Sequence, residues 1–390
     1  MNENNTKNLL MVLESQFPTV GGGGAEKQVQ TLCRHLPDNV NATIITPRVV
    51  GGSNKVHDQV DGIQVIRIAY PHIPHIGGII MLIKLAYYIF ANRKKISAIH
   101  CHIANNMAAI SCLMGWCFNM PTVVKLTGWL ELEYGILSNN NSFINKFKRS
   151  LIKKATAIQA TSHDMERRLL DLGFASDRVH FIPNSVDTHR FKSDASIKST
   201  LKNNMALTSE FVMVFIGRLV PEKSLDTLLN AWNNAIDKQA SADLLIIGEG
   251  VLRKDLESLA DKLSISHQVK FVGAVSDVSD YLKISDIGVL PSEFEGLSNS
   301  LLESMAAGLP MIGSRVSGTV DMIEEGISGW TFKAGDIEHL SNIIAKAYSL
   351  PKAQLESMGT RSRKKIEETS SIEHVLSVLF NLYKFNQVNK

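Results

Sequence analysis

The sequence lacks the patterns that mark several common classes of protein. Its four cysteines form no C-x-x-C pair and stand near no zinc-type histidine pattern, so free thiols of a reducing compartment are expected rather than disulfides or a metal centre. No basic segment precedes an apolar run at the N-terminus, and the apolar stretches 77–91 and 107–124 are too short or too interrupted to span a membrane. These absences predict a cytoplasmic protein that is at most peripheral to the inner face of the cell membrane.

Acidic residues are comparatively scarce in the first half of the chain. Residues 1–200 hold 22 Lys and Arg against 14 Asp and Glu, a net charge of +8. Because the whole chain has a net charge of +3, the remaining residues have a net charge of −5. The segments 84–95 and 145–154 mix basic with aromatic and aliphatic residues, a pattern that suits contact with an anionic membrane surface. The chain shows no pattern of stacking aromatics and its overall pI is only about 8.5, so no nucleic acid is expected as a partner.

Short apolar runs alternate with helical patterns along almost the whole chain. One series runs from 8–14 to 179–184, and a second begins at 211–217 and ends at 329–332. Continuous apolar strands between helices predict parallel, doubly wound sheets with both faces covered. The expected fold is therefore α/β, with a first Rossmann-like domain over 1–190 and a second over 205–370. The amphipathic helix of 371–390 is expected to join the first domain.

The glycine-rich stretch 19-TVGGGGAEKQV-29 follows the first strand and precedes a helix. Glycines at this point let backbone N–H groups approach an anion, and the helix dipole favours negative charge. The stretch has neither the G-x-G-x-x-G of dinucleotide folds nor the G-K-[ST] of a Walker loop. It predicts a phosphate-approach loop, with a flexible connection as the alternative.

A second candidate lies in 214-VFIGRLVPEKSLDTLLNAW-232, where a buried strand ends in Gly217. Arg218 and Lys223 follow just before a helix. A guanidinium fork and a compact ammonium at such a place can hold a diphosphate and neutralise it as it leaves. The alternative is a solvated surface pair.

The third candidate is 292-SEFEGLSNSLLESMAAGLP-310, where Glu295 and Glu303 flank the start of a helix expected over 297–307. The amides around Gly296, Leu297 and Ser298 would be unpaired at the first turn and could bind a ligand. Carboxylates accept paired hydrogen bonds from vicinal hydroxyls, so two of them suit a molecule with diols at both ends. The alternative is a dipole partner followed by an exposed helical glutamate.

Taken together, these elements resemble the retaining glycosyltransferases of family 4, whose GT-B architecture has two facing Rossmann-like domains with a cleft between them. The E-x7-E motif is met by Glu295 and Glu303, and G-R-L-x-x-x-K by Gly217, Arg218, Leu219 and Lys223. The inter-domain I-P-N-G-V-D motif appears as 182-IPNSVD-187, and the G-G-A-E motif begins at Gly23. The motifs occur in the family's order over nearly the whole chain.

The resemblance implies a nucleoside-diphosphate sugar (UDP-, GDP- or another) bound mainly to the second domain, without a metal or other cofactor. Glu303 would hold the ribose, Arg218 and Lys223 the diphosphate, and the main chain near Val275 the base. The donor sugar would meet Glu295, Gly296, Leu297 and Ser298, and Gly22 and Gly23 would approach the phosphates from the first domain. The acceptor would be a glycan or a lipid-linked sugar of cell-surface polysaccharide assembly, and the product would keep the anomeric configuration of the donor.

The chain departs from the family's pattern at several positions. Ser224 and Ser185 replace glycines, and Thr127-Gly128 stands where many relatives have His-Gly beside the donor sugar. No acid–base role is therefore assigned to Thr127, although it could bind the sugar, and His102 at another strand end is a further possible substrate contact. Two other functions stay open: a sugar-nucleotide epimerase of the same architecture, and a sugar-nucleotide binding module without catalysis.

Overall fold

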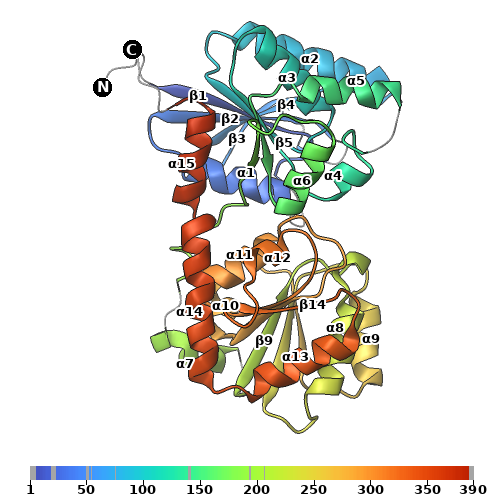
Figure 1. Cartoon of the computed structure of the whole chain (residues 1–390), viewed down its shortest axis with the longest axis vertical. Coiled ribbons are helices and arrows are strands. Elements are labelled where there is room, and N and C mark those ends of the chain that lie inside the picture. The colour runs from blue at the N-terminus through green and yellow to red at the C-terminus, as the bar shows by residue number, and fades with distance from the viewer. Residues whose placement is uncertain are drawn as a thin grey trace. The chain divides into compact units, whose positions relative to one another are not determined.

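The computed structural model describes residues 6–18, 23–49, 52–53, 55–74, 76–138, 142–192, 195–205 and 207–385. The chain forms two compact units, one of Met1–Ser185 with Ile372–Lys390 and the other of Val186–Ser371. Within each unit, helices cover a predominantly parallel sheet (Figure 1). This confirms the predicted fold class, since each unit is a Rossmann-like α/β domain.

In the described part of the first unit the sheet has eight strands, in the order β3-β4-β2-β1-β5-β6-β7-β8. The strands are β1 (Lys7–Leu13), β2 (Val40–Pro47), β3 (His57–Val60), β4 (Ile63–Ile68), β5 (Ala98–His102), β6 (Thr122–Lys125), β7 (Ala157–Ala160) and β8 (Val179–Phe181). The helices are α1 (Gly24–Arg34), α2 (Ile76–Asn92), α3 (Asn106–Cys117), α4 (Leu130–Glu133), α5 (Phe143–Ile152), α6 (His163–Asp171) and α15 (Ile372–Leu382).

The sheet of the second unit has the order β11-β10-β9-β12-β13-β14 over the residues described. Its strands are β9 (Phe211–Ile216), β10 (Ala242–Ile247), β11 (Val269–Gly273), β12 (Ile287–Leu290), β13 (Met311–Ser314) and β14 (Gly329–Phe332). Its helical segments are α7 (Ala195–Asn204), η2 (Pro221–Lys223), α8 (Leu225–Ala235), α9 (Arg253–Lys262), α10 (Ser279–Ile284), α11 (Asn299–Ala306), α12 (Thr319–Met322), α13 (Ile337–Ser349) and α14 (Lys352–Thr369).

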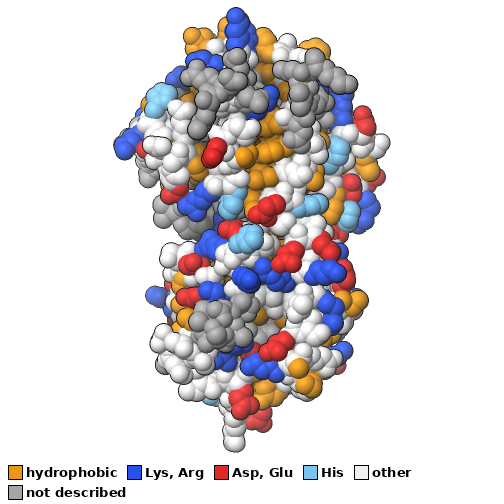
Figure 2. Space-filling view, turned by 90° about the vertical axis from the view of Figure 1, so that its left-hand side faces the viewer, with side chains coloured by type: hydrophobic (Ala, Val, Ile, Leu, Met, Phe, Trp, Pro, Cys, Tyr) orange, Lys and Arg blue, Asp and Glu red, His pale blue; other side chains and the backbone are white. Residues whose placement is uncertain are grey.

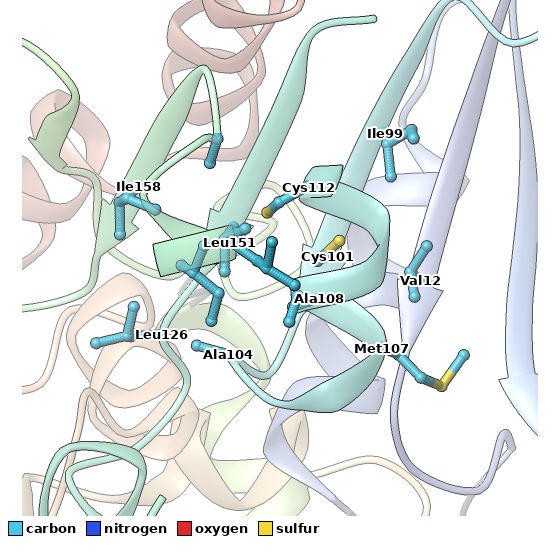
Figure 3. Close-up of a cluster of buried hydrophobic side chains, with 14 of the residues drawn as sticks. Val12, Ile99, Cys101, Ala104, Met107, Ala108, Cys112, Leu126, Leu151 and Ile158 are labelled. Atoms are coloured by element: carbon cyan, nitrogen blue, oxygen red, sulfur yellow. The ribbon is translucent and has the colours of Figure 1, made fainter. Parts of the chain in front are cut away.

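The buried side chains of the first unit fall into two clusters because successive residues of a strand point to opposite faces of the sheet. On one face, Leu10 and Val12 of β1 pack with residues of α2, α3 and α5. Figure 3 shows part of this cluster, in which Met107, Ala108 and Cys112 of α3 lie over the sheet. On the other face, Leu9 and Met11 pack with residues of α1 and α15. The C-terminal helix thus completes one of the unit's two cores, as its amphipathic pattern predicts.

Some elements differ from the sequence-based expectation. β3 is an antiparallel edge strand, paired with β4, in a stretch that the alternation of apolar runs does not mark. The polar segment between the two series of strands contains α7, whose Lys198 Nζ lies 2.7 Å from Asp286 Oδ1 in the second unit. The long helix α14 precedes α15 and was not predicted. No helix of the described residues is both long and apolar enough to cross a membrane.

Candidate functional site

The carboxyl ends of β9 and β12 mark the place in the second unit where the strand order reverses. β9 continues to β10 and β11 on one side, whereas the chain returns to β12 on the other side of β9. In open α/β sheets the loops that leave two such strands diverge and form a ligand-binding crevice. The loop after β9 carries Arg218 and Lys223, and the loop after β12 carries Glu295. The topology therefore brings two of the three predicted motifs to one edge of one sheet.

Lys223 and Glu295 meet directly at this edge. The Lys223 ammonium is paired with Glu295 Oε2, and both side chains are largely buried, with 12% and 16% of their surface exposed. Ser292 Oγ donates a hydrogen bond to the same carboxylate oxygen at 3.3 Å. The backbone N–H of Glu293 donates to Glu222 O at 2.9 Å, which fixes the two loops to each other. A phosphate oxygen arriving here would find a cation whose position is already set by a carboxylate.

Ser224, which replaces the family's glycine, adopts the left-handed conformation, with φ 47° and ψ 46°. Side chains other than glycine, Asn and Asp reach this region only at a cost, so the structure explains why glycine is favoured here. The Ser224 hydroxyl is also buried and has no hydrogen-bond partner. The substitution is thus tolerated at a cost in stability, while Lys223 keeps its place before α8.

The segment before α11 is packed closely against the rest of the second unit. Gly296, Leu297 and Ser298 are buried, and Ser298 is the N-cap residue of α11. A Cβ atom on Gly318 would lie 2.2 Å from Gly296 O, so only glycine allows this approach of the two backbones. Glu303 is 5% exposed and lies little more than one turn into α11, nearer the helix start than the sequence-based helix bounds imply. The first-turn amides of such a helix lack partners within it and favour an anion.

Arg218 and Val275 lie at the periphery of this edge. The Arg218 guanidinium is 61% exposed and lies 3.1 Å from Oε1 of Glu222, four residues further along the same loop. An exposed pair of this kind contributes little stability, so the guanidinium can exchange its partner for a phosphate at small cost. Val275 follows β11 and is half-buried, in a loop whose start is fixed by a bond from Gly248 N to Gly273 O at 2.9 Å.

In the first unit, Gly22 falls outside the described residues, and Gly23 is the N-cap residue of α1 with an extended backbone. A Cβ atom on Gly23 would meet the Glu26 carboxylate, which the Ser15 hydroxyl also contacts. Gln28, one turn further along α1, exchanges hydrogen bonds with Ser185: its Nε2 donates to Ser185 O at 2.8 Å, and Ser185 N donates to its Oε1 at 2.9 Å. Ser185, the other residue that replaces a family glycine, is thereby joined to α1.

His102 belongs to a buried polar row across the carboxyl ends of β5 and β6. Its ring is 1% exposed and stacks on His100, with 4.3 Å between the ring centroids. Neither ring nitrogen of His102 has a hydrogen-bond partner in the structure, and burial holds the pKa of this imidazole well below its usual value. His100 Nδ1 lies 2.6 Å from the hydroxyl of Tyr383, the residue that follows α15. Burial lowers the pKa of His100 to about 3. Both histidines are therefore neutral, and contact between His102 and substrate stays a prediction.

Lys125 pairs in register with His102 and is itself 1% exposed. Its ammonium has one long hydrogen bond, to Gln28 Oε1 at 3.4 Å, and burial lowers its pKa to about 7, against the attraction of Glu131. Lys125 was not predicted as a site residue, although a lysine inside the apolar run 122-TVVKLTG-128 is itself a signal of a buried charge.

Thr127 lies half-buried at the end of β6 and is held by Glu131. Glu131 Oε1 accepts hydrogen bonds from Thr127 N at 2.7 Å, Gly128 N at 2.9 Å and the Thr127 hydroxyl. Glu131 Oε2 accepts from Ala104 N at 2.6 Å, in the loop after β5. Burial raises the pKa of Glu131, and these hydrogen bonds oppose the rise. Glu131 was not predicted as a site residue, because nothing in 129-WLELEYG-135 distinguishes a glutamate that binds a loop from an exposed one.

Among the residues described, no group of three or more His, Cys, Asp or Glu side chains is placed to hold a metal ion. The expectation that neither a metal nor another cofactor takes part stays a prediction.

Comparison with known proteins identifies the family. The family described as "Glycosyl transferases group 1" matches residues 197–365, and "Glycosyltransferase Family 4" matches residues 22–190. An N-acetyl-alpha-D-glucosaminyl L-malate synthase of Bacillus anthracis is 26% identical over 299 residues, which are 75% of this chain and 76% of that protein. A UDP-Gal:alpha-D-GlcNAc-diphosphoundecaprenol alpha-1,3-galactosyltransferase of Escherichia coli is 25% identical over 313 residues, 78% of this chain and 80% of that one.

The fold has close counterparts among solved structures. The Anabaena protein Alr3699/HepE in complex with UDP superimposes with a TM-score of 0.77 at 18% identity, over 97% of this chain and 99% of that one. A sucrose-phosphate synthase from Thermosynechococcus elongatus gives a TM-score of 0.78 at 18% identity, over 97% and 98% of the two chains. These likenesses support the fold, and the two family matches together span most of the sequence. The chain belongs to the group 1 glycosyltransferases of family 4 and is a glycosyltransferase of the GT-B fold.

Proposed function

We propose that this glycosyltransferase moves a hexosyl unit from a nucleoside-diphosphate sugar to a glycan or lipid-linked acceptor, with retention of configuration, in the assembly of a cell-surface polysaccharide. The observation that carries the proposal is the pairing of Lys223 with Glu295 at the point where the strand order of the second unit reverses. The pair places a cation that can bind a phosphate in direct contact with a carboxylate that can bind hydroxyl groups.

The donor would lie along this edge with its parts matched to different chemical groups. Arg218 and Lys223 neutralise the diphosphate, which helps most as the bond to the sugar breaks and negative charge grows on the leaving group. Glu295 and the backbone of 296–298 hold the sugar, and the buried carboxylate of Glu303 accepts from the ribose hydroxyls. The main chain near Val275 meets the base. The acceptor hydroxyl then attacks the donor sugar from the face that the diphosphate leaves, and the leaving diphosphate can take the proton of that hydroxyl.

The relatives support a sugar-nucleotide donor and a lipid-linked acceptor without fixing either. The Escherichia coli relative is named for a UDP-galactose donor and a diphosphoundecaprenol-linked acceptor. A "Capsular polysaccharide biosynthesis glycosyltransferase" of Staphylococcus aureus is 25% identical over 56% of both chains. A mannosyltransferase of Mycobacterium tuberculosis is described as GDP-mannose-dependent. UDP- and GDP-hexoses are therefore the donors to test first.

A lipid-linked acceptor would require the enzyme to work at a membrane, and we propose contact through α2 and α5. The exposed apolar residues of these two helices, here called the α2–α5 surface, are Ile76, Ile79, Ile83, Tyr87, Phe90, Phe143, Ile144 and Phe147. The opposite face of α2 is also apolar, because Met81, Leu85 and Ile89 are buried in the core. A helix that is apolar all round is normally covered on all sides, so the outer face of α2 is expected to have a partner. Figure 2 shows another face of the molecule, on which the first unit carries a patch of hydrophobic side chains and the second unit carries many charged side chains of both signs.

The charge around the α2–α5 surface favours an anionic bilayer as that partner. Residues 62–130 contain no Asp or Glu, and neither do residues 134–163. Lys94 and Lys95 follow α2 directly and are exposed, and Lys146 and Lys148 lie on α5. Each basic residue near an anionic membrane adds roughly 1 kcal/mol of attraction. The proposed location is therefore the inner face of the cell membrane.

The proposed reaction is tested by incubating the protein with UDP- and GDP-hexoses and lipid-diphosphate sugars, and by following released nucleoside diphosphate and product anomer. Transfer with a retained configuration supports the proposal, and an inverted product overturns the retaining mechanism. Release of an epimer without nucleoside diphosphate would indicate an epimerase, and tight binding without turnover a binding module. Lys223→Ala and Glu303→Ala should both lose donor binding, with Lys262→Ala on exposed α9 as a matched control. Unchanged kinetics in both site variants would refute the site assignment.

A further inference from the structure

The four hydrogen bonds that Glu131 accepts join two loops of the first unit. Ala104 lies in the loop after β5, and Thr127 and Gly128 lie in the loop after β6. β5 and β6 are neighbours in the sheet, so both loops leave the same edge. A single carboxylate thus fixes the backbone of both loops where they leave the sheet.

The loop after β5 needs such support because it is strained. Ile103 has a φ of 76°, in the left-handed region that a β-branched residue adopts only with strain. Ala104, the next residue, donates its N–H to Glu131, and Asn105 N donates to Ile103 O at 2.9 Å. On the far side of the loop, Glu14 Oε2 accepts from Met107 N at 2.6 Å. Two carboxylates therefore hold the strained segment from both ends.

The same contacts decide what the Thr127 hydroxyl can do. An ionised carboxylate only accepts hydrogen bonds, and Glu131 receives three from backbone N–H groups. The Thr127 hydroxyl must therefore donate its one proton to Glu131. Towards any other group the Thr127 oxygen offers only lone pairs. The side chain is half-buried, so part of it remains open to a ligand. A histidine in this position could instead donate through a ring N–H.

We propose that Glu131 is a positioning residue that makes Thr127 an acceptor-only contact, so that Thr127 selects a donor sugar bearing a hydroxyl that donates to it. The inference rests on the proposed function, because it takes Thr127 to face the donor sugar. It adds a rule of selection: a sugar in which that hydroxyl is replaced by hydrogen or fluorine loses the contact, since fluorine has no proton to donate. Recognition through a histidine N–H would instead tolerate fluorine as a weak acceptor.

The first experiment compares the transferred sugar nucleotide with its monofluoro and monodeoxy analogues in the wild-type protein and in Thr127→Val and Thr127→Ser. One position of the sugar should show about a tenfold fall in kcat/KM for both analogues, the loss expected for one hydrogen bond worth about 1.4 kcal/mol. Thr127→Val should lower kcat/KM about tenfold for the parent sugar and leave the two analogues of that position unaffected. Thr127→Ser should behave as wild type. Equal losses for parent and analogues in Thr127→Val would overturn the inference, since a merely structural role affects all donors alike.

The second experiment tests Glu131 independently of turnover. Glu131→Gln should speed hydrogen exchange in peptides containing Ala104, Thr127 and Gly128 at least tenfold, because the amide oxygen is uncharged and its NH₂ group repels one of the donors. Glu133→Gln is the matched control, since Glu133 accepts from Trp129 Nε1 at 2.8 Å and joins no loops. Unchanged exchange in Glu131→Gln would refute the positioning role. Failure of the proposed function looks different: the wild-type protein would turn over no sugar nucleotide, while the exchange result would still stand.

Discussion

Replacing the buried lysine of β6 with methionine should stabilise the first unit. Burial lowers the pKa of Lys125 from 10.5 to about 7. A difference of 3.5 units corresponds to about 5 kcal/mol, by which folding disfavours the charged ammonium. Methionine fills a similar volume without a charge, and Gln28 Oε1 keeps its hydrogen bond from Ser185 N. We expect Lys125→Met to raise the free energy of unfolding by up to about 4 kcal/mol at pH 7, where the ammonium is half neutralised.

The pH dependence separates this cause from a simple gain in packing. Between pH 7 and 10.5 the unfolded state binds more protons at Lys125 than the folded state, so the wild-type protein gains stability as the pH rises. The advantage of Lys125→Met should therefore shrink to about 2 kcal/mol at pH 9 and vanish above pH 10.5. The difference in free energy of unfolding between Lys125→Met and the wild-type protein is measured by urea unfolding with peptide-resolved hydrogen exchange over β5–β7. Lys146→Met, at an exposed position, is the control. A constant difference at pH 7 and 9, or a loss of stability at both, would refute the reasoning.

Three further predictions concern other residues. Ser224→Gly should stabilise the second unit by about 1 kcal/mol in urea unfolding, because it removes a left-handed serine and a buried unpaired hydroxyl; a destabilised variant would contradict this. Between pH 6.5 and 5.5 the first unit should lose about 1 kcal/mol per pH unit for each of His100 and His102, since burial depresses both pKa values and only the unfolded state takes up protons. His102→Gln should halve that slope. Ile79→Glu with Ile83→Glu should weaken sedimentation with anionic vesicles at least tenfold, whereas Val251→Glu, on an exposed residue of the second unit, should not; equal binding by both variants would exclude the α2–α5 surface.

Much of the fold could be predicted because it depends on local patterns that the sequence displays directly. The apolar runs at 211–217 and 242–248 contain the observed strands β9 and β10, which are buried at nearly every position and therefore continuously apolar. β3 was missed because its exposed edge residues, His57–Val60, show no apolar pattern. α14 was missed because its single buried stripe, which includes Leu355 and Ile366, is sparse among charged residues.

The candidate site could be predicted only where the chemistry lies within one short segment. Lys223 and Glu295 were each proposed from a motif, but their contact spans 72 residues and depends on the strand order. Glu131 and Lys125 were missed for a related reason. A carboxylate that binds the backbone of another loop, and a lysine covered by α1, acquire their roles from neighbours that are distant in sequence. Such roles are set by topology and burial, which no single segment encodes.

The packing of α15 in the core of the first unit has a consequence for how the protein is made. Ile372, Val375, Leu376 and Leu379 complete one core of the first unit, yet they follow the entire second unit in the sequence. The sheet of residues 7–181 is therefore synthesised with the part of this apolar face that α15 covers still exposed, and it stays so while the entire second unit emerges. The second unit has all its segments in one continuous stretch and can finish folding first. The first unit is therefore synthesised first, but it can complete its core only after the second unit has been synthesised.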